Sequence, residues 1–321
     1  MARRHVFASE ALGVLLMLLA SVDYYFRVST PPPQRLIRQH VEQRCEWVFS
    51  KYVSSPWEYE WHKNINRFQN EVCAITKHDE IKCDKWIQSL TKGGFPMDIF
   101  SYFVFDNNCT NEVRLHFIEP LVGLTRHPYF CLHGEEFLVN KDYMLIYPIN
   151  THQNNYYFDL GASTYTSGAG GSSQSWFVET AYPNIRWDGI YCWESSPVNA
   201  EQVWAEIPGN LKPVYHWYNI PVNPAVNHSD NALEYIAKVA RPEDWVVLKI
   251  DIDNSDVEMQ LLERILQDTT ISSLIDELFF EHHVDVEPML PYWGSNPLKL
   301  SDTYTLFHRL RNLGILAHPW V

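Results

Sequence analysis

Residues 157–163 carry the sequence Tyr-Phe-Asp-Leu-Gly-Ala-Ser, and more glycines follow at 168–171. The apolar run predicts a β-strand that ends near Asp159, and Gly161 predicts a turn in which the backbone can approach a ligand closely. In an open α/β sheet, a glycine-rich turn between a strand and a helix forms part of a nucleotide pocket. We therefore expect a cofactor site formed by Asp159, Gly161, Ala162 and Ser163.

Two later apolar segments also end in acidic residues. Residues 190–193 precede Glu194, whose carboxylate suits hydrogen bonds to the two hydroxyls of a ribose. Residues 245–250 form a nearly continuous apolar run, as expected of a central parallel strand covered on both faces. Asp251 and Asp253 follow it directly. Because ligands bind outside the carboxyl ends of parallel strands, these acids are candidates for the same site.

A third apolar segment, residues 275–280, is followed by Glu281, His282 and His283. A histidine can act as a general base near neutral pH, and a neighbouring carboxylate can orient it. We expect Glu281, His282 and Asp251 to face one acceptor pocket. His283 is expected to matter less, because adjacent residues of a strand point to opposite faces.

These motifs together resemble the FkbM-like S-adenosylmethionine-dependent methyltransferases, over roughly the second half of the chain. The similarity is carried by Asp-Leu-Gly-Ala at 159–162, Trp-Glu-Ser-Ser-Pro at 193–197, Asn-Ile-Pro-Val at 219–222 and Leu-Lys-Ile-Asp at 248–251. The resemblance implies an α/β fold, a Rossmann-like class I methyltransferase sheet. It also implies S-adenosylmethionine as cofactor and methyl transfer to an oxygen, a hydroxyl of a glycan or of a small metabolite.

In such an enzyme positioning supplies much of the acceleration, because the sulfonium is already reactive. The resemblance implies that Asp159 lies near the amino-acid end of the cofactor and Glu194 on its ribose, above a floor made by residues 161–163. The proton of the acceptor would pass to His282. Alternatively, a divalent metal held by Asp251 and Glu281 would lower the pKa of the acceptor hydroxyl.

The triplet Asp251-Ile252-Asp253 permits a second hypothesis. Many lumenal glycosyltransferases hold a divalent metal against a sugar-nucleotide diphosphate with two acids spaced in this way. This hypothesis leaves the glycine turn after Asp159 unexplained, and a helix is expected to begin immediately after the triplet. A catalytically silent fold that serves as a scaffold is the third hypothesis.

The first 33 residues predict a cytosolic tail, a membrane anchor and a stem. Arg3 and Arg4 precede an apolar segment at about 6–26, which favours a type II anchor with the amino terminus in the cytosol. Three prolines at 31–33 suit a stiff, extended stem. A cleaved signal peptide and a buried N-terminal helix are the alternatives. In the two leading cases the rest of the chain lies in the lumen of the endoplasmic reticulum or Golgi.

A lumenal location would allow disulfides, and the chain has six cysteines. Cys192 lies in an apolar strand and is expected to be a buried free thiol. Proximity favours the pairs Cys73–Cys83 and Cys109–Cys131, although spacing does not fix connectivity. Glycosylation sequons at two asparagines suit the same compartment. These are Asn108 and Asn227.

The remaining chain is expected to contain an irregular N-terminal elaboration, residues 34–154, and a methyltransferase-like domain, residues 155–321. Apolar spacing predicts an amphipathic helix over 34–53, and the aromatic residues of 54–155 are candidates for acceptor recognition. After Asp253 we expect a helix capped by Ser255 and Glu258. A helix at about 301–313 that stops at Gly314 and a strand at 315–318 would close the fold.

The charge of the chain argues against one class of partner. Lysine and arginine number 25 and aspartate and glutamate 39, so the formal net charge is -14. Such a chain repels polyphosphate and lacks the basic surface that dominates binding to nucleic acid. We expect a small-molecule or glycan acceptor and the membrane as partners, and no nucleic acid.

Overall fold

The computed structural model describes residues 45–147, 153–166 and 173–321, and residues 45–321 belong to one compact unit. The predicted membrane anchor and stem lie outside the described residues, as does the predicted helix up to residue 44. Within the described ranges, no helix has both the length and the apolar character needed to cross a membrane.

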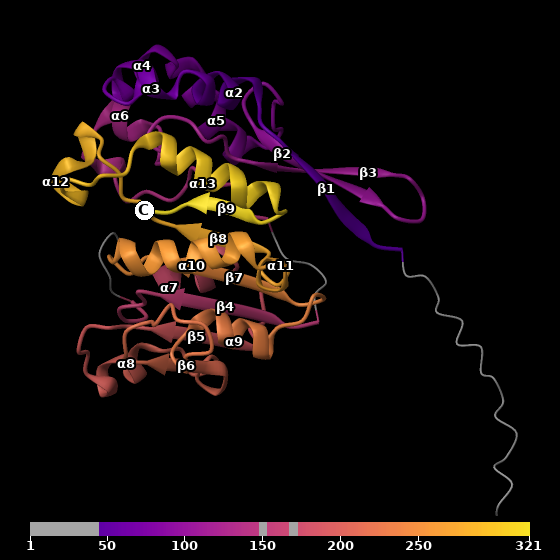
Figure 1. The fold of residues 1–321 in the computed structure, drawn as a ribbon, viewed down its shortest axis with the longest axis vertical. Coiled ribbons are helices and arrows are strands. Elements are labelled where there is room, and N and C mark those ends of the chain that lie inside the picture. Colours follow the sequence, from indigo (N-terminus) through magenta and orange to yellow (C-terminus); the bar gives the residue numbers. More distant parts are fainter. Residues whose placement is uncertain (1–44, 148–152, 167–172) are drawn as a thin grey trace, which may run out of the picture. The chain divides into compact units, whose positions relative to one another are not determined.

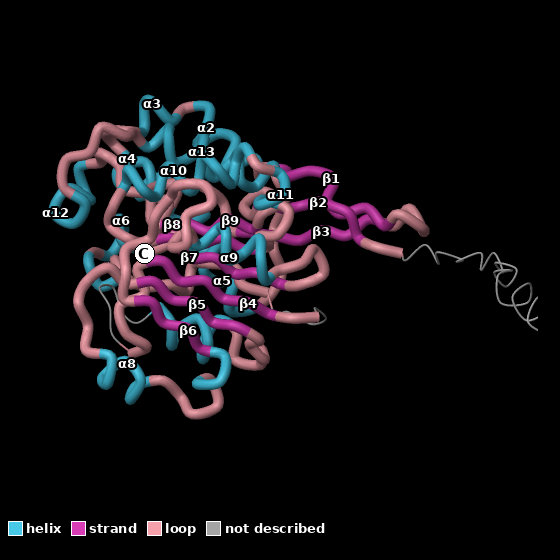
Figure 2. Tube along the Cα trace, turned by 60° about the horizontal axis from the view of Figure 1, so that its bottom comes forward, coloured by secondary structure: helices cyan, strands magenta, loops and turns pink. Residues whose placement is uncertain are grey.

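A six-stranded sheet forms the centre of this unit, and all of its strands are parallel. Figures 1 and 2 show the strands side by side in the order β6-β5-β4-β7-β8-β9. Strand order reverses between β4 and β7, as in doubly wound Rossmann-like sheets. The α/β prediction is therefore confirmed at the level of a Rossmann-like fold. The strands are β4 (Asn155–Leu160), β5 (Gly189–Trp193), β6 (Tyr215–Tyr218), β7 (Trp245–Ile250), β8 (Glu277–Phe280) and β9 (Leu316–Pro319).

The register brings the ends of four strands level with one another. Leu160 pairs with Trp193 on one side and with Ile250 on the other, and Ile250 pairs with Phe280. Each of these is the last residue of its strand. The segments that follow β4, β5, β7 and β8 therefore begin at one edge of the sheet, where ligands bind in this class of fold.

Helices connect the strands. They include α8 (Ala200–Glu206), α9 (Ala232–Val239), α10 (Ser255–Gln267), α11 (Thr269–Ser272) and α13 (Leu300–Asn312). The expected final helix and closing strand are confirmed by α13 and β9, and Gly314 between them has a φ of 91°.

The prediction that Ser255 and Glu258 cap α10 is wrong. Asn254 caps the helix, because its side chain accepts a hydrogen bond from the Val257 N–H at 3.3 Å. The carboxylate of Glu258 instead accepts from the Ile252 N–H at 2.9 Å, outside the helix.

The N-terminal elaboration combines a three-stranded antiparallel sheet with short helices, which Figure 1 shows in indigo to magenta. The strands are β1 (Trp47–Val53), β2 (Ser101–Asn107) and β3 (Val113–Ile118), and the helices are α2 (Pro56–Lys63), α3 (Ile65–Phe68), α4 (Val72–His78), α5 (Glu80–Lys92) and α6 (Tyr129–His133). The predicted helix over 34–53 is wrong for β1. This segment pairs with β2 from Trp47 to Val53, and these cross-strand hydrogen bonds override its helical apolar spacing.

Two disulfides join parts of the elaboration that are distant in sequence. Cys45 is bonded to Cys109, and Cys73 in α4 is bonded to Cys131 in α6. The pairs expected from proximity are therefore wrong, because Cys83 lies inside the hydrophobic core and remains a free thiol. Cys192 is also buried and free, as predicted.

Buried charges connect the elaboration to the parallel sheet. Arg311 on α13 lies 3.1 Å from Glu119 and 3.6 Å from Glu58, measured from guanidinium nitrogen to carboxylate oxygen. His318 on β9 contacts Glu119 through Nδ1 and Glu277 through Nε2, each at 2.9 Å. We call these five residues the Arg311 cluster. All of them are buried.

Candidate functional site

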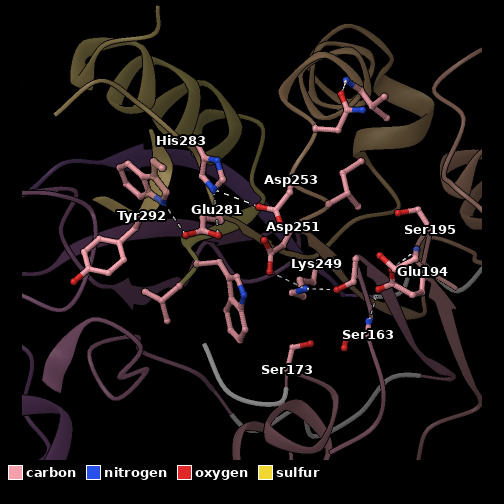
Figure 3. A pocket seen from close by; sticks show the side chains of 18 of the residues that line it. Ser163, Ser173, Glu194, Ser195, Lys249, Asp251, Asp253, Glu281, His283 and Tyr292 are labelled. Carbon is pink, nitrogen blue, oxygen red and sulfur yellow. Dashed lines mark hydrogen bonds and ion pairs between the residues drawn. The ribbon is translucent and has the colours of Figure 1, made fainter. Parts of the chain in front are cut away.

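A pocket of about 940 Å³ lies at the carboxyl edge of the parallel sheet. Its size falls within the range of about 300–1,000 Å³ that is usual for small-molecule sites. Residues that follow all six strands of the sheet contribute to its wall. They are Gly161 and Ser163, Glu194 to Ser196, Ile220 to Val222, Asp251 to Asn254, Glu281 and His283, and Trp320 and Val321. Figure 3 shows this pocket from close by.

Gly161 forms part of the pocket wall in a left-handed conformation, with a φ of 85°. A Cβ atom at this position would lie 1.7 Å from the carbonyl oxygen of Asp251. The glycine is therefore required by the close approach of two protein backbones, rather than by a ligand as the sequence had suggested. Ala162 is buried behind the wall, whereas Ser163 lines the pocket.

Glu194 also lines the pocket, and its carboxylate is held in place by backbone donors. One oxygen accepts from the Ser163 N–H at 2.7 Å, and the other accepts from the Ser196 N–H at 2.6 Å. The Gly161 and Ala162 N–H groups both donate to the carbonyl of Trp193 at 3.0 Å. The turn after β4 and the acid after β5 thus form one rigid corner. Since an ionised carboxylate can accept about four hydrogen bonds, both oxygens retain capacity for a ligand.

A buried lysine lies beside this corner. The Nζ atom of Lys249 is 3.2 Å from Asp159 and 3.0 Å from Asp251, and it donates to the carbonyl of Gly161 at 3.1 Å. We call Lys249, Asp159 and Asp251 the Lys249 cluster. Although burial acts against its charge, the two carboxylates raise the pKa of Lys249. Burial raises the pKa of Asp159 and of Asp251, against the effect of the lysine.

This geometry changes the role expected of Asp159. Its side chain is fully buried and does not line the pocket, so it acts on a ligand through two partners that do, Lys249 at 3.2 Å and the Ser173 hydroxyl, which donates to it at 3.3 Å. Lys249 itself lines the pocket and was not predicted. The signal in the sequence was a single lysine within the apolar run 245–250, since a buried lysine must have acidic partners.

The opposite end of the pocket contains Glu281 and His283. One oxygen of Glu281 accepts two hydrogen bonds. The Arg126 guanidinium donates one, and the Trp293 Nε1–H donates the other at 3.0 Å. The other oxygen lies 3.3 Å from Nε2 of His283, and the same nitrogen is 3.9 Å from Asp253. Burial opposes the charge of Glu281, but the His283 contact and the Arg126 guanidinium lower its pKa to about 2. Despite burial, these acids raise the pKa of His283.

The two neighbouring histidines are placed in the reverse of the expected way. His283 lines the pocket, whereas His282 is 6% exposed and its Nδ1 lies 2.9 Å from Oγ1 of Thr303 on α13. Burial lowers the pKa of His282 to about 4. The physical reason is the alternation of side chains in extended backbone, which puts Glu281 on the same face as His283.

The elaboration contributes three residues to the pocket wall, Arg126, Leu138 and Val139. None of these three is aromatic, and the tryptophan and tyrosine side chains of the wall are Trp193, Tyr292, Trp293 and Trp320, so the aromatic residues predicted in 54–155 for acceptor recognition do not line this pocket among the described residues. Tyr292 and Trp293 belong to the short helix α12 (Leu290–Trp293). No sequence pattern predicted that this segment, between β8 and α13, would reach the pocket.

Comparisons with known proteins identify no relative of this chain. No protein-family model matches it, and no curated protein and no solved structure matches it either. The resemblance to the FkbM-like methyltransferases therefore rests on the sequence motifs alone.

Proposed function

We propose that this protein is an S-adenosylmethionine-dependent O-methyltransferase that acts on a hydroxyl of a glycan or small metabolite in the secretory pathway. The main supporting observation is the corner formed by Glu194 and Ser163. A carboxylate fixed at the end of the second strand, beside a glycine turn at the end of the first, is suited to the hydroxyl pair of a ribose. The residue lines the pocket and two backbone N–H groups already fix its carboxylate, so little reorganisation is needed on binding.

The charge of the pocket also supports a cationic cofactor. Four acids line it, Glu194, Asp251, Asp253 and Glu281, against two permanent cations, Lys249 and Arg126. S-adenosylmethionine carries a sulfonium and an ammonium group against one carboxylate, so it brings net positive charge to this surplus of acids. Lys249 lines the same wall, but its ammonium group already contacts Asp159, Asp251 and the Gly161 carbonyl, so a cofactor carboxylate would have to replace one of these contacts.

The order of groups along the pocket separates a cofactor end from an acceptor end. Figure 3 shows Glu194 and Ser163 at one side, Glu281 and His283 at the other, and Lys249 between them. A cofactor bound from Glu194 to Lys249 would direct its methyl group toward Glu281 and His283. These are then the polar groups that an acceptor hydroxyl meets, and His282 is not one of them.

The glycosyltransferase hypothesis has weaker support. It requires both acids of the triplet 251–253 to serve a metal, but the carboxylate of Asp251 is already paired with Lys249 at 3.0 Å. That hypothesis also assigns no task to the corner at Glu194.

Isothermal titration calorimetry of the full chain tests the proposal. We expect saturable binding of S-adenosylmethionine and no binding of sugar nucleotides when they are added to protein already saturated with manganese. Glu194→Gln should weaken cofactor binding roughly tenfold to a hundredfold, the usual value of a hydrogen bond to a charged group. Glu201→Gln, which changes an exposed acid on α8, is the matched control.

Three outcomes would count against the proposal. Binding of sugar nucleotides alone would favour the glycosyltransferase, and no binding of either ligand would favour the scaffold. Unchanged cofactor affinity in folded Glu194→Gln would remove the corner from the cofactor site.

A further inference from the structure

We propose that Asp253, Glu281 and His283 hold a divalent transition-metal ion at the acceptor end of the pocket. Each offers one ligand atom, and these three atoms lie within 4.8 Å of one another. Metal–ligand bonds of about 2.1 Å place neighbouring ligand atoms about 3–4 Å apart, so small side-chain rotations suffice to enclose an ion. We call these residues the Asp253 cluster. It differs from the sequence expectation, which included Asp251.

The second observation is that the ligands are oriented by residues behind them. Arg126 and Trp293 both donate to the same oxygen of Glu281, and the other oxygen is left facing His283. The indole of Trp293 also stacks on the His283 ring, with the ring centres 5.5 Å apart and the planes at 24°. Hydrogen-bonded carboxylates and fixed imidazole planes are the usual outer support of metal sites.

The third observation is that the carboxylate of Asp253 has no lysine or arginine partner among the described residues. Lys249 forms an ion pair with Asp251, and Arg126 forms one with Glu281. Within the described part of the chain, Asp253 forms no ion pair with any lysine or arginine; its nearest cationic partner is His283 at 3.9 Å. Its side chain is 81% exposed to the pocket side and solvent, so it is open to an ion from solution.

The ligand chemistry restricts the ion. Two carboxylates and one imidazole suit manganese, iron, zinc and similar ions, whereas calcium and magnesium prefer oxygen ligands alone. Three protein ligands leave coordination positions for water or substrate, as catalytic sites require. On the proposed function, which this step assumes, the ion would lower the pKa of an acceptor hydroxyl beside it, so that the proton would pass to solvent water near neutral pH. Binding of the ion itself requires no cofactor.

The test uses the full chain and Mn²⁺ without S-adenosylmethionine, with binding measured by calorimetry and by the electron paramagnetic resonance signal of free Mn²⁺. We expect one saturable site. Asp253→Asn should weaken it by at least tenfold, because a charged ligand is lost while asparagine still tolerates the φ of 54°. Trp293→Phe keeps the aromatic ring and removes the donor to Glu281, so it should weaken binding roughly tenfold to a hundredfold.

Asp256→Asn is the matched control, because it removes an exposed negative charge three residues away and outside the cluster. It should leave Mn²⁺ affinity unchanged. The proposal is overturned if the parent shows no saturable binding, if Asp253→Asn binds like the parent, or if the control loses as much affinity as Asp253→Asn. Cofactor binding without Mn²⁺ binding would reject the metal site alone, whereas Mn²⁺ binding without cofactor binding would reject the methyltransferase alone.

Discussion

The Arg311 cluster and the Lys249 cluster each contain a buried cation that contacts two acids. Arg311 contacts Glu58 and Glu119, and Lys249 contacts Asp159 and Asp251. They differ in what lies on their open side. Arg311, Glu58 and Glu119 have side chains no more than 2% exposed, and further donors from the protein fill their remaining positions. In the Lys249 cluster, Asp159 is fully buried, but Asp251 is 21% exposed at the pocket wall.

The difference separates a structural role from a functional one. In a sealed cluster the charged groups pair only with other groups of the protein, and here these pairs join α13 to the elaboration. An open cluster presents charge to whatever enters the pocket, so a ligand can replace one of its contacts. A buried cation between acids is therefore not a functional signal by itself, and the exposure of one partner is what distinguishes the two cases.

Removing the sealed cation should have the largest effect. Arg311→Leu leaves Glu58 without a cation in the core and Glu119 with His318 alone, and breaking such a buried pair typically costs about 3–5 kcal/mol. Urea unfolding of the full chain measures this loss. Arg309→Leu, on the exposed face of the same helix, is the control and should cost less than about 1 kcal/mol. A small loss in Arg311→Leu would show that the cluster contributes no more than a surface pair.

The sealed cluster should also give the protein a specific dependence on pH. Burial opposes the charge of His318, but Glu119 and Glu277 raise its pKa to about 9, from about 6.5 in the unfolded chain. Its contribution to stability, on the order of 3 kcal/mol, is complete below pH 6.5 and is lost as pH rises through 9. Arg311 shares Glu119 with His318 and is the neighbouring cation, whereas burial lowers the pKa of His116 to about 4, so that His116 is neutral over this pH range.

Urea unfolding at pH 6.5 and at pH 9.5 measures this dependence. His318→Gln keeps a polar side chain without the charge, so the fall in unfolding free energy between the two pH values should be smaller than in the parent. An equal fall in both proteins would place the pH dependence elsewhere.

Removing the cation of the Lys249 cluster should give the smallest loss of stability. Lys249→Met removes the cation from Asp159 and Asp251, and burial already favours the protonated form of both acids. Since Asp251 can also meet water at the pocket wall, we expect a loss of about 2 kcal/mol, smaller than that of Arg311→Leu. The control is Lys238→Met, at an exposed position of α9. If Lys249→Met lowers the free energy of unfolding as much as Arg311→Leu does, the distinction between a sealed and an open cluster is wrong.

The parallel strands were the most predictable part of the fold. The runs that became β4, β5, β7 and β8 are mostly apolar because both faces of the sheet are covered, and each is followed at once by the turn, acid or histidine residues that reach the pocket edge. Glu194, Asp251 and Glu281 were placed at that edge for this reason, and all three line the pocket.

The residues that were misjudged depend on contacts between distant segments. Trp47 to Val53 has helical apolar spacing, but β2 supplies a hydrogen-bonding partner. The choice between His282 and His283 depended on side-chain alternation counted from Glu281, and on the presence of α13 above His282. Arg126 is 155 residues from Glu281 in sequence, so only the folded chain reveals their contact.

The disulfide between α4 and α6 has a practical consequence for preparing the protein. Cys131 lies five residues after Arg126, so this crosslink tethers the segment that positions Glu281. A production host whose cytosol keeps thiols reduced would deliver protein without that tether, even where the parallel sheet has folded. Thiol reductants in assay buffers would have the same effect, and they offer no benefit, because the free thiols of Cys83 and Cys192 are buried and protected from oxidation.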